Sequence, residues 1–178
     1  MELTHGEGGG VVCGTFGCSL EVSGDSHPAW SPNGSEIAIV RTWHLGRGWE
    51  IHLIDLLGNA VRLTTSLHAS SPSWSPDGLR IAFTGSNVGI IYVIGRDGSG
   101  LTEFQTNLQI AGVAWSPDGE TIAFWTIGGS VESHIYLFDI ATSAVTRLTQ
   151  PGSSNFSLSW SPDGSQAVFS SRMFRHDI

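Results

Sequence analysis

Acidic side chains recur at regular spacing along this chain and are the first candidates for chemistry. Asp77, Asp118 and Asp163 each lie between a proline and a glycine, within a repeated Trp-Ser-Pro-Asp-Gly unit. Carboxylates can transfer protons or hold a cation, and both roles depend on the negative charge. The first copy of the unit carries Asn33 instead, which lacks that charge. Because Asn and Asp can both bond back to the backbone of a turn, we expect all four to be turn residues.

Other signatures of catalysis or metal binding do not occur in the sequence. It contains no Gly-x-Ser-x-Gly elbow, His-Glu-x-x-His motif, EF-hand loop or cysteine-rich zinc spacing. His27 and His68 occupy similar places in successive units, but two histidines without a third ligand make a weak metal site. We interpret Cys13 and Cys18 as small turn residues and leave a local disulfide open. The sequence predicts no catalytic residue, metal or cofactor.

The composition narrows the range of partners. The 178 residues are 40% hydrophobic and only 13% charged, which indicates a folded chain. A net charge of −8, with eight arginines and no lysine, does not attract phosphate backbones, so we expect no nucleic-acid partner. No apolar run reaches the ~18 residues of a membrane span, so we expect no direct membrane insertion. The first ten residues lack the basic and apolar regions of a signal peptide.

A repeat of just over forty residues organises the chain. Its four tryptophans that precede Ser-Pro are 44, 41 and 45 residues apart: Trp30, Trp74, Trp115 and Trp160. Four short strands fit a period of this length, which is typical of a β-propeller blade. Apolar segments bounded by Gly, Pro, Asn or Asp follow each tryptophan, and none has a helical period. We therefore predict an all-β fold of four-stranded antiparallel blades, about four of which are present.

Small and large side chains alternate before each tryptophan. The preceding residue is Ala or Ser, and the residue before that is larger. Because side chains alternate between the faces of a strand, each sheet should have one bulky and one shallow face. Sheets of this kind stack bulk into hollow, as propeller blades do without sharing one common core. We expect the four tryptophans to be core residues rather than a ligand platform.

These units resemble the TolB-like β-propeller repeat, a relative of the WD-repeat propellers. Residues 72–78 read Pro-Ser-Trp-Ser-Pro-Asp-Gly and are followed by Ile-Ala-Phe at 81–83, a near-perfect copy of the family pattern. Residues 135–139 (Ile-Tyr-Leu-Phe-Asp) and 147–149 (Arg-Leu-Thr) match its later strands.

The resemblance covers about residues 19–178 and leaves residues 1–18 as a Gly-rich, partly disordered N-terminal segment. Blades are expected to begin near residues 26, 70, 111 and 156, with the last one cut short. Because the family closes rings of six or more blades, we predict a fragment of a larger propeller. An alternative is that residues 19–22 supply the outer strand of the last blade and close a four-bladed ring.

In such propellers the first strand of each blade lines a central channel, and the loops leading into it form a mouth. The resemblance therefore implies a recognition surface at this mouth for a protein or peptide partner, and a small-molecule ligand stays open. The residues expected to contribute are Asp25, Ser26, His27, Trp43, Trp49, His68, Ser70, Ser71, Gln109 and Asn155.

The resemblance implies a non-catalytic scaffold for protein–protein interaction in the periplasm or another extracytoplasmic compartment. Without a signal peptide in the sequence, the cytoplasm stays open. Two alternatives are the regulatory propeller of a prolyl-oligopeptidase-type serine peptidase and the sensor propeller of a signalling protein. The first would be joined to an α/β-hydrolase domain, and the second to a kinase, a winged helix or a membrane span.

Overall fold

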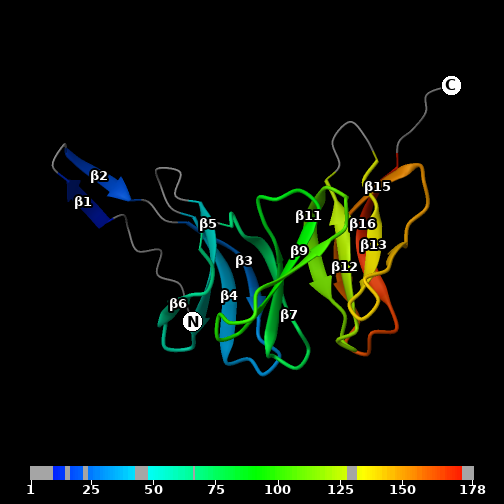
Figure 1. Ribbon diagram of the computed structural model, residues 1–178, viewed down its shortest axis with the longest axis horizontal. Helices are drawn as coiled ribbons and strands as arrows, with labels where there is room; N and C mark the ends of the chain where they lie inside the picture. Colours follow the sequence, from blue (N-terminus) through cyan, green and yellow to red (C-terminus); the bar gives the residue numbers. More distant parts are fainter. Residues whose placement is uncertain are drawn as a thin grey trace.

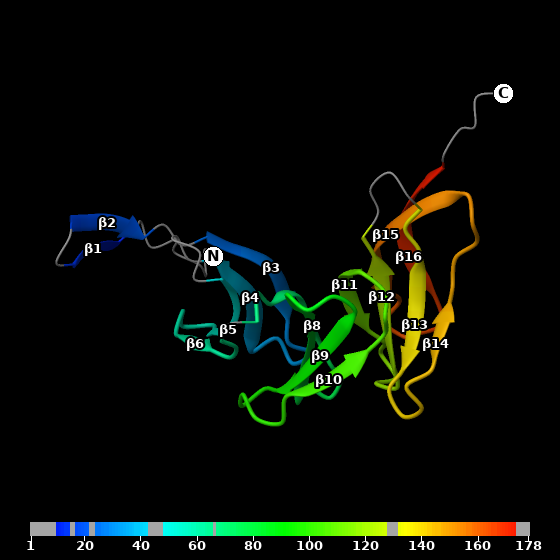
Figure 2. The same ribbon diagram turned by 45° about the horizontal axis from the view of Figure 1, so that its top comes forward.

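Every regular element in the described part of the chain is a β-strand. The computed structural model describes residues 10–14, 17–21, 24–42, 48–65, 67–127 and 132–173. Four successive antiparallel sheets follow one another along residues 24–173 and fan out side by side in an open arc (Figures 1 and 2). The predicted all-β propeller architecture is confirmed.

Each of the first three sheets is a complete four-stranded meander, in which neighbours in sequence pair antiparallel. The first blade contains β3 (Gly24–Trp30), β4 (Glu36–Thr42), β5 (Trp49–Asp55) and β6 (Ala60–Arg62). The second contains β7 (Ser70–Trp74), β8 (Arg80–Thr84), β9 (Ile90–Gly95) and β10 (Thr102–Gln105). The third contains β11 (Ile110–Trp115), β12 (Thr121–Thr126), β13 (Ile135–Asp139) and β14 (Val145–Arg147).

The fourth sheet has two strands within the described residues, β15 (Ser153–Trp160) and β16 (Ala167–Met173). A separate hairpin near the N-terminus is formed by β1 (Gly10–Gly14) and β2 (Gly17–Glu21). In this hairpin Leu20 pairs with Val11, and Cys13 is the backbone partner of Cys18. β2 belongs to this separate hairpin and not to the sheet of β15 and β16, so the alternative in which residues 19–22 complete the last blade is wrong.

The repeated Ser-Pro-Asp-Gly units form the tight turns between the first and second strands, at the bottom of the blades in Figure 1. In the second blade the Gly78 amide donates to the Ser75 carbonyl at 2.9 Å, and Gly78 has a φ of 69°. Asp77 Oδ1 accepts from Ser75 Oγ and from the Leu79 amide. Asn33 Oδ1 makes the corresponding bonds in the first blade. The turn role predicted for these residues is confirmed.

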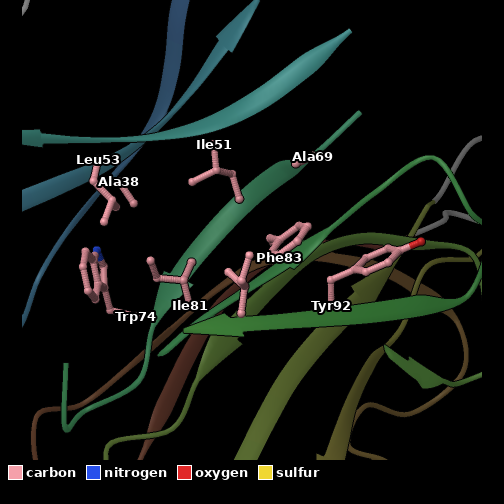
Figure 3. Packing of buried hydrophobic residues seen from close by; sticks show 9 residues of the cluster. Ala38, Ile51, Leu53, Ala69, Trp74, Ile81, Phe83 and Tyr92 are labelled. Carbon is pink, nitrogen blue, oxygen red and sulfur yellow. The ribbon is translucent and has the colours of Figure 1, made fainter. Parts of the chain in front are cut away.

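Adjacent blades pack bulky face against shallow face. Trp74, Ile81 and Phe83 of the second blade are at most 7% exposed and share one apolar cluster with residues of the first. The first blade contributes Ala38, Ile51 and Leu53 to this cluster, as Figure 3 shows. Burying such large side chains is the main stabilising contribution of each interface.

Two of the tryptophan indoles also bond to the preceding blade, whereas Trp115 Nε1 donates to the Gly119 carbonyl of its own blade. Trp74 Nε1 donates to the Ala29 carbonyl of the first blade at 3.0 Å, and Trp160 Nε1 donates to the Ala114 carbonyl of the third at 3.3 Å. Each acceptor is the residue before the tryptophan of the preceding blade. Trp30 differs from the expectation of a core residue, since it is 56% exposed. Its blade is the first of the arc. Within the described residues, no preceding blade covers the Trp30 indole or offers it a carbonyl acceptor.

Candidate partner-binding face

Each innermost strand is bulged near its start, at the end of the blade opposite the Pro-Asp-Gly turns. The register of pairing shifts between Ser26 and Ala29 in β3, and at the corresponding places in β7, β11 and β15. His27, Ser71 and Ser157 lie in these shifts with φ of 50°, 50° and 58°. All three stand three residues before the tryptophan of their blade. Left-handed backbone at non-glycine residues costs about 1–3 kcal/mol and often clusters at functional sites.

The third blade has a glycine at the corresponding position, but its backbone is not left-handed. Gly112 stands three residues before Trp115, and a Cβ at this position would overlap the Trp125 ring. The glycine lets the bulged strand approach the indole closely. A register shift is present in all four blades, and in the third it lies between Ile110 and Gly112, with Gly112 itself paired with Trp125.

In the first blade, three of the expected site residues lie in β3. Asp25 accepts from Arg41 Nε at 2.8 Å and from Arg41 Nη2 at 2.9 Å. His27 is exposed, and its Nδ1 lies 3.1 Å from Ser26 Oγ. Asp25 therefore serves as an ion-pair partner at the strand end, and the Ser26–His27 pair presents polar hydrogen-bonding atoms to solvent.

Trp49 begins β5, and His68, in the loop that leads from the first blade to the second, lies against it. Their ring centroids are 6.4 Å apart with the planes at 76°, and the Ala69 amide donates to the Trp49 carbonyl at 2.8 Å. Trp49 is 51% exposed, and His68 has a φ of 46°. An exposed indole held edge-to-face by a neighbouring ring is a suitable anchor for a partner. Trp43, which we also expected at this face, lies outside the described residues.

The second and third blades meet through the remaining expected residues. The Ser71 hydroxyl donates to the Ala111 carbonyl at 3.4 Å, and the Ser70 carbonyl accepts from Thr84 Oγ1 at 3.2 Å. Gln109 is exposed and lines a cavity of about 220 Å³ between the two blades. The lining includes backbone and side chains of the β8–β9 loop, residues 85–89. Gln109 and Asn87 are thus the two exposed amides that line this junction.

Asn155 differs from the expectation of an exposed loop amide. It is only 1% exposed, and its Nδ2 donates to Ser153 Oγ at 3.0 Å and to the Ser133 carbonyl at 3.3 Å. In return Ser133 Oγ donates to the Asn155 carbonyl at 2.9 Å. A buried amide must have its hydrogen bonds satisfied internally, and here they join the third blade to the fourth. Asn155 is therefore part of the framework behind the face.

Sequence reasoning missed a buried charged group on the first blade. Glu50 and His52 are 7% and 6% exposed, His52 Nε2 lies 3.7 Å from Glu50 Oε2, and Arg62 Nη1 lies 3.9 Å from Glu50 Oε1. Burial, followed by the nearby Arg41 charge, lowers the pKa of His52. The signal was present, because His52 replaces the tyrosine found at the equivalent place in the second and third blades, Tyr92 and Tyr136.

The described residues contain no group of three or more His, Cys, Asp or Glu side chains placed to hold a metal ion. They also include no helix with the length and hydropathy that crossing a membrane requires. What this face offers is an exposed indole, histidines, hydroxyls and an amide on a rigid sheet framework. Such a set can recognise a surface by apolar contact and hydrogen bonding.

Comparison with known proteins agrees with this architecture, although no family model matches the chain. The Tol-Pal system protein TolB of Zymomonas mobilis is 43% identical over 53 residues, which are 29% of this chain and 12% of that protein. TolB from Acinetobacter baumannii superposes with a TM-score of 0.70 at 28% identity, over 83% of this chain and 37% of that chain. A putative TolB from Agrobacterium tumefaciens superposes with a TM-score of 0.67 at 19% identity, over 90% of this chain and 73% of that chain.

Propellers attached to enzymes share the fold as well. An acylaminoacyl peptidase from Pyrococcus horikoshii superposes with a TM-score of 0.60 at 17% identity, over 83% of this chain and 27% of that chain. At this identity the likeness concerns the fold alone.

Stacked four-stranded meanders that each insert a tryptophan into the preceding sheet place this chain among the β-propeller proteins. Within that class, its Trp-Ser-Pro-Asp-Gly blades are similar to those of TolB proteins. The chain spans 12% of the curated relative and 37% of the Acinetobacter protein.

Proposed function

We propose that this chain is a non-catalytic propeller scaffold that binds a protein or peptide partner at the bulged ends of its innermost strands. The observation that carries the proposal is the exposed Trp49–His68 pair, which lies at the end of the blades where the innermost strands are bulged. Strained backbone is common at binding sites, and exposed aromatic rings on a rigid scaffold are suitable anchors for a protein partner. The likeness to a Tol-Pal system protein supports a protein partner and a periplasmic setting.

Affinity capture tests this proposal with variants that leave the core intact. Trp49→Ala combined with His68→Ala removes the exposed ring pair, whereas Leu57→Ala changes a residue that is 88% exposed in the β5–β6 turn at the opposite end of the blade. The immobilised wild type should retain a specific protein from a periplasmic extract. The Leu57 variant should retain the same protein, and the double variant should lose most of it.

Equal capture by the double variant and the wild type, with unchanged thermal unfolding, would place binding elsewhere on the molecule. Photo-crosslinking from position 109 adds a direct check, because Gln109 lies at the neighbouring junction. A crosslink to the captured protein is the expected result.

A further inference from the structure

A second pocket between the second and third blades lies at the end that carries the Pro-Asp-Gly turns, opposite the proposed partner-binding face. Its volume is about 220 Å³, and both blades that enclose it are complete four-stranded sheets. The second blade contributes Arg80, Phe104 and residues of the β9–β10 turn, and the third contributes Trp115 and Ile140. We call this space the turn-end pocket. It is smaller than the ~300 Å³ at which sites for larger ligands begin, so it suits a group about the size of one amino acid.

At the equivalent place between the first and second blades, an ion pair joins the two sheets. Arg96 Nε and Nη2 of the second blade donate to Glu36 Oε2 and Oε1 of the first, at 2.5 and 2.8 Å. Glu36 begins β4, and Arg96 directly follows β9. Two parallel bonds between a guanidinium and a carboxylate are among the stronger polar contacts in proteins.

Between the second and third blades, both members of this pair are replaced. Arg80 begins β8 as Glu36 begins β4, six residues after the tryptophan of its blade. Ile140 takes the place of Arg96, because the amides of both residues donate to a carbonyl of the turn that precedes the second strand of their blade. The second junction therefore has a cation where the first has an anion, and an apolar side chain where the first has the opposite charge.

The Arg80 guanidinium has only weak partners within the described part of the chain. Its Nη2 lies 3.8 Å from Asp77 Oδ2, and both side chains are more than two-fifths exposed. Its Cζ lies 5.0 Å from the centroid of the Trp115 ring. A long ion pair between exposed groups contributes little to stability. The N–H groups of Arg80 can therefore turn to an incoming carboxylate at low cost.

The Trp115 indole is oriented differently from those of the neighbouring blades. Its Nε1 donates to the Gly119 carbonyl of its own turn at 3.2 Å, whereas the indoles of Trp74 and Trp160 donate to the preceding blade. Its ring lies under Arg80 and forms part of the pocket wall. The turn-end pocket thus combines one cation with apolar and aromatic walls.

We propose that the turn-end pocket binds a monocarboxylate with an aromatic or aliphatic body of about one side chain. The carboxylate accepts two N–H groups of Arg80, as the carboxylate of Glu36 accepts those of Arg96 in the first junction. The apolar body lies against Trp115 and Phe104. A free small acid and the C-terminal residue of a peptide both carry this chemistry.

NMR titration of the whole chain with 3-phenylpropanoate tests the proposal, with the indole N–H signal of Trp115 as reporter. Saturable binding with a Kd of about 1 mM or tighter is expected. 3-Phenylpropanamide has the same body without the charge and should bind about tenfold more weakly or worse. Arg80→Gln should weaken binding of the acid by a similar factor. Arg172→Gln removes the same charge at an exposed position of β16 and should leave binding unchanged.

Ile140→Glu tests the comparison between the two junctions. It places a carboxylate opposite Arg80, so the cross-blade pair of the first junction is restored with its charges reversed. This variant should keep or raise the midpoint of thermal unfolding, and it should no longer bind the acid.

A tripeptide ending in phenylalanine separates the two sources of the ligand. Tighter binding of the tripeptide than of 3-phenylpropanoate assigns the pocket to a peptide C-terminus, and the reverse order assigns it to a free acid. The proposal is overturned if neither compound gives a saturable shift at about 10 mM. It is also overturned if the acid and its amide bind alike, or if Arg80→Gln binds the acid like the wild type.

Discussion

Asp77, Asp118 and Asp163 show how a regularly spaced acid can serve the fold instead of chemistry. In each turn one carboxylate oxygen accepts from the serine two residues earlier, and from an amide two residues later. These bonds favour the ionised form and lower the pKa of all three residues, with Asp163 at about 2. The ionised form of these carboxylates therefore stabilises the folded state.

A first prediction concerns acid stability. The folded-state pKa of these carboxyls is depressed, so their stabilising effect is present above the unfolded pKa near 4 and is lost as pH falls toward 2. In the triple variant Asp77→Asn, Asp118→Asn and Asp163→Asn, each turn keeps an acceptor oxygen, as Asn33 does. Its unfolding midpoint should depend less on pH between 4 and 2 than that of the wild type. Parallel curves in urea titrations at each pH would contradict this explanation.

A second prediction compares two tryptophans that occupy the same place in their repeats. Trp74 is 7% exposed and bonds to the first blade, whereas Trp30 is 56% exposed. Trp74→Ala should lower the free energy of unfolding by about 3–5 kcal/mol, because it opens a cavity between blades. Trp30→Ala should cost less than about 1 kcal/mol. Urea denaturation measures both values, and equal losses would mean that the tryptophans do not pack on the preceding blade.

At the scale of the element, the bulge in each innermost strand is the feature that shapes the candidate face. It turns the strand where the blades meet, and it places His27, Ser71 and Ser157 in left-handed backbone. Alternating strand residues face opposite sides, so a bulge shifts which side chains reach the surface. The third blade keeps a register shift, between Ile110 and Gly112, without a left-handed residue there, which indicates that the bend in the strand is needed in every blade.

A third prediction tests this strain with two serines of the same strand. Ser157 has a φ of 58°, which a β-branched residue adopts poorly, whereas Ser159 is not among the left-handed residues. Ser157→Val should destabilise the protein by about 1–2 kcal/mol. Ser159→Val should have little effect or stabilise it slightly, since valine favours strands. Equal effects of the two substitutions on the urea midpoint would show that the bulge stores no such strain.

At the scale of the whole molecule, the row of stacked blades follows from the repeat of just over forty residues in the sequence. The period fixes the tight turns, the strands and the stacking order, so local chemistry in the sequence was enough to predict the blades. The exposure of Trp30 and the burial of Asn155 were not predictable in this way, and the repeat marks His52 as a departure without showing that Glu50 and His52 are buried. Their exposure or burial depends on which neighbouring blade or loop covers them, and spacing within one repeat carries no information about that neighbour.

The candidate face was predictable to the same extent. The sequence placed Trp49, His68 and Gln109 at one end of the blades, where the structure also has them exposed. It could not show that Trp49 meets His68, because that contact joins β5 to the loop that leads from the first blade to the second. Nor could it show that the Asp25 carboxylate is bound by Arg41.

The central claim is that each sheet after the first inserts its tryptophan into the face of the sheet before it. Nuclear Overhauser contacts from the Trp74 indole to methyl groups of the first blade test this claim most directly in solution. Cross-peaks to Ala38 and Leu53 are expected, since these residues share one buried cluster with Trp74. An indole that shows contacts only within residues 70–105 would mean that the sheets do not stack as blades, and the account would be wrong.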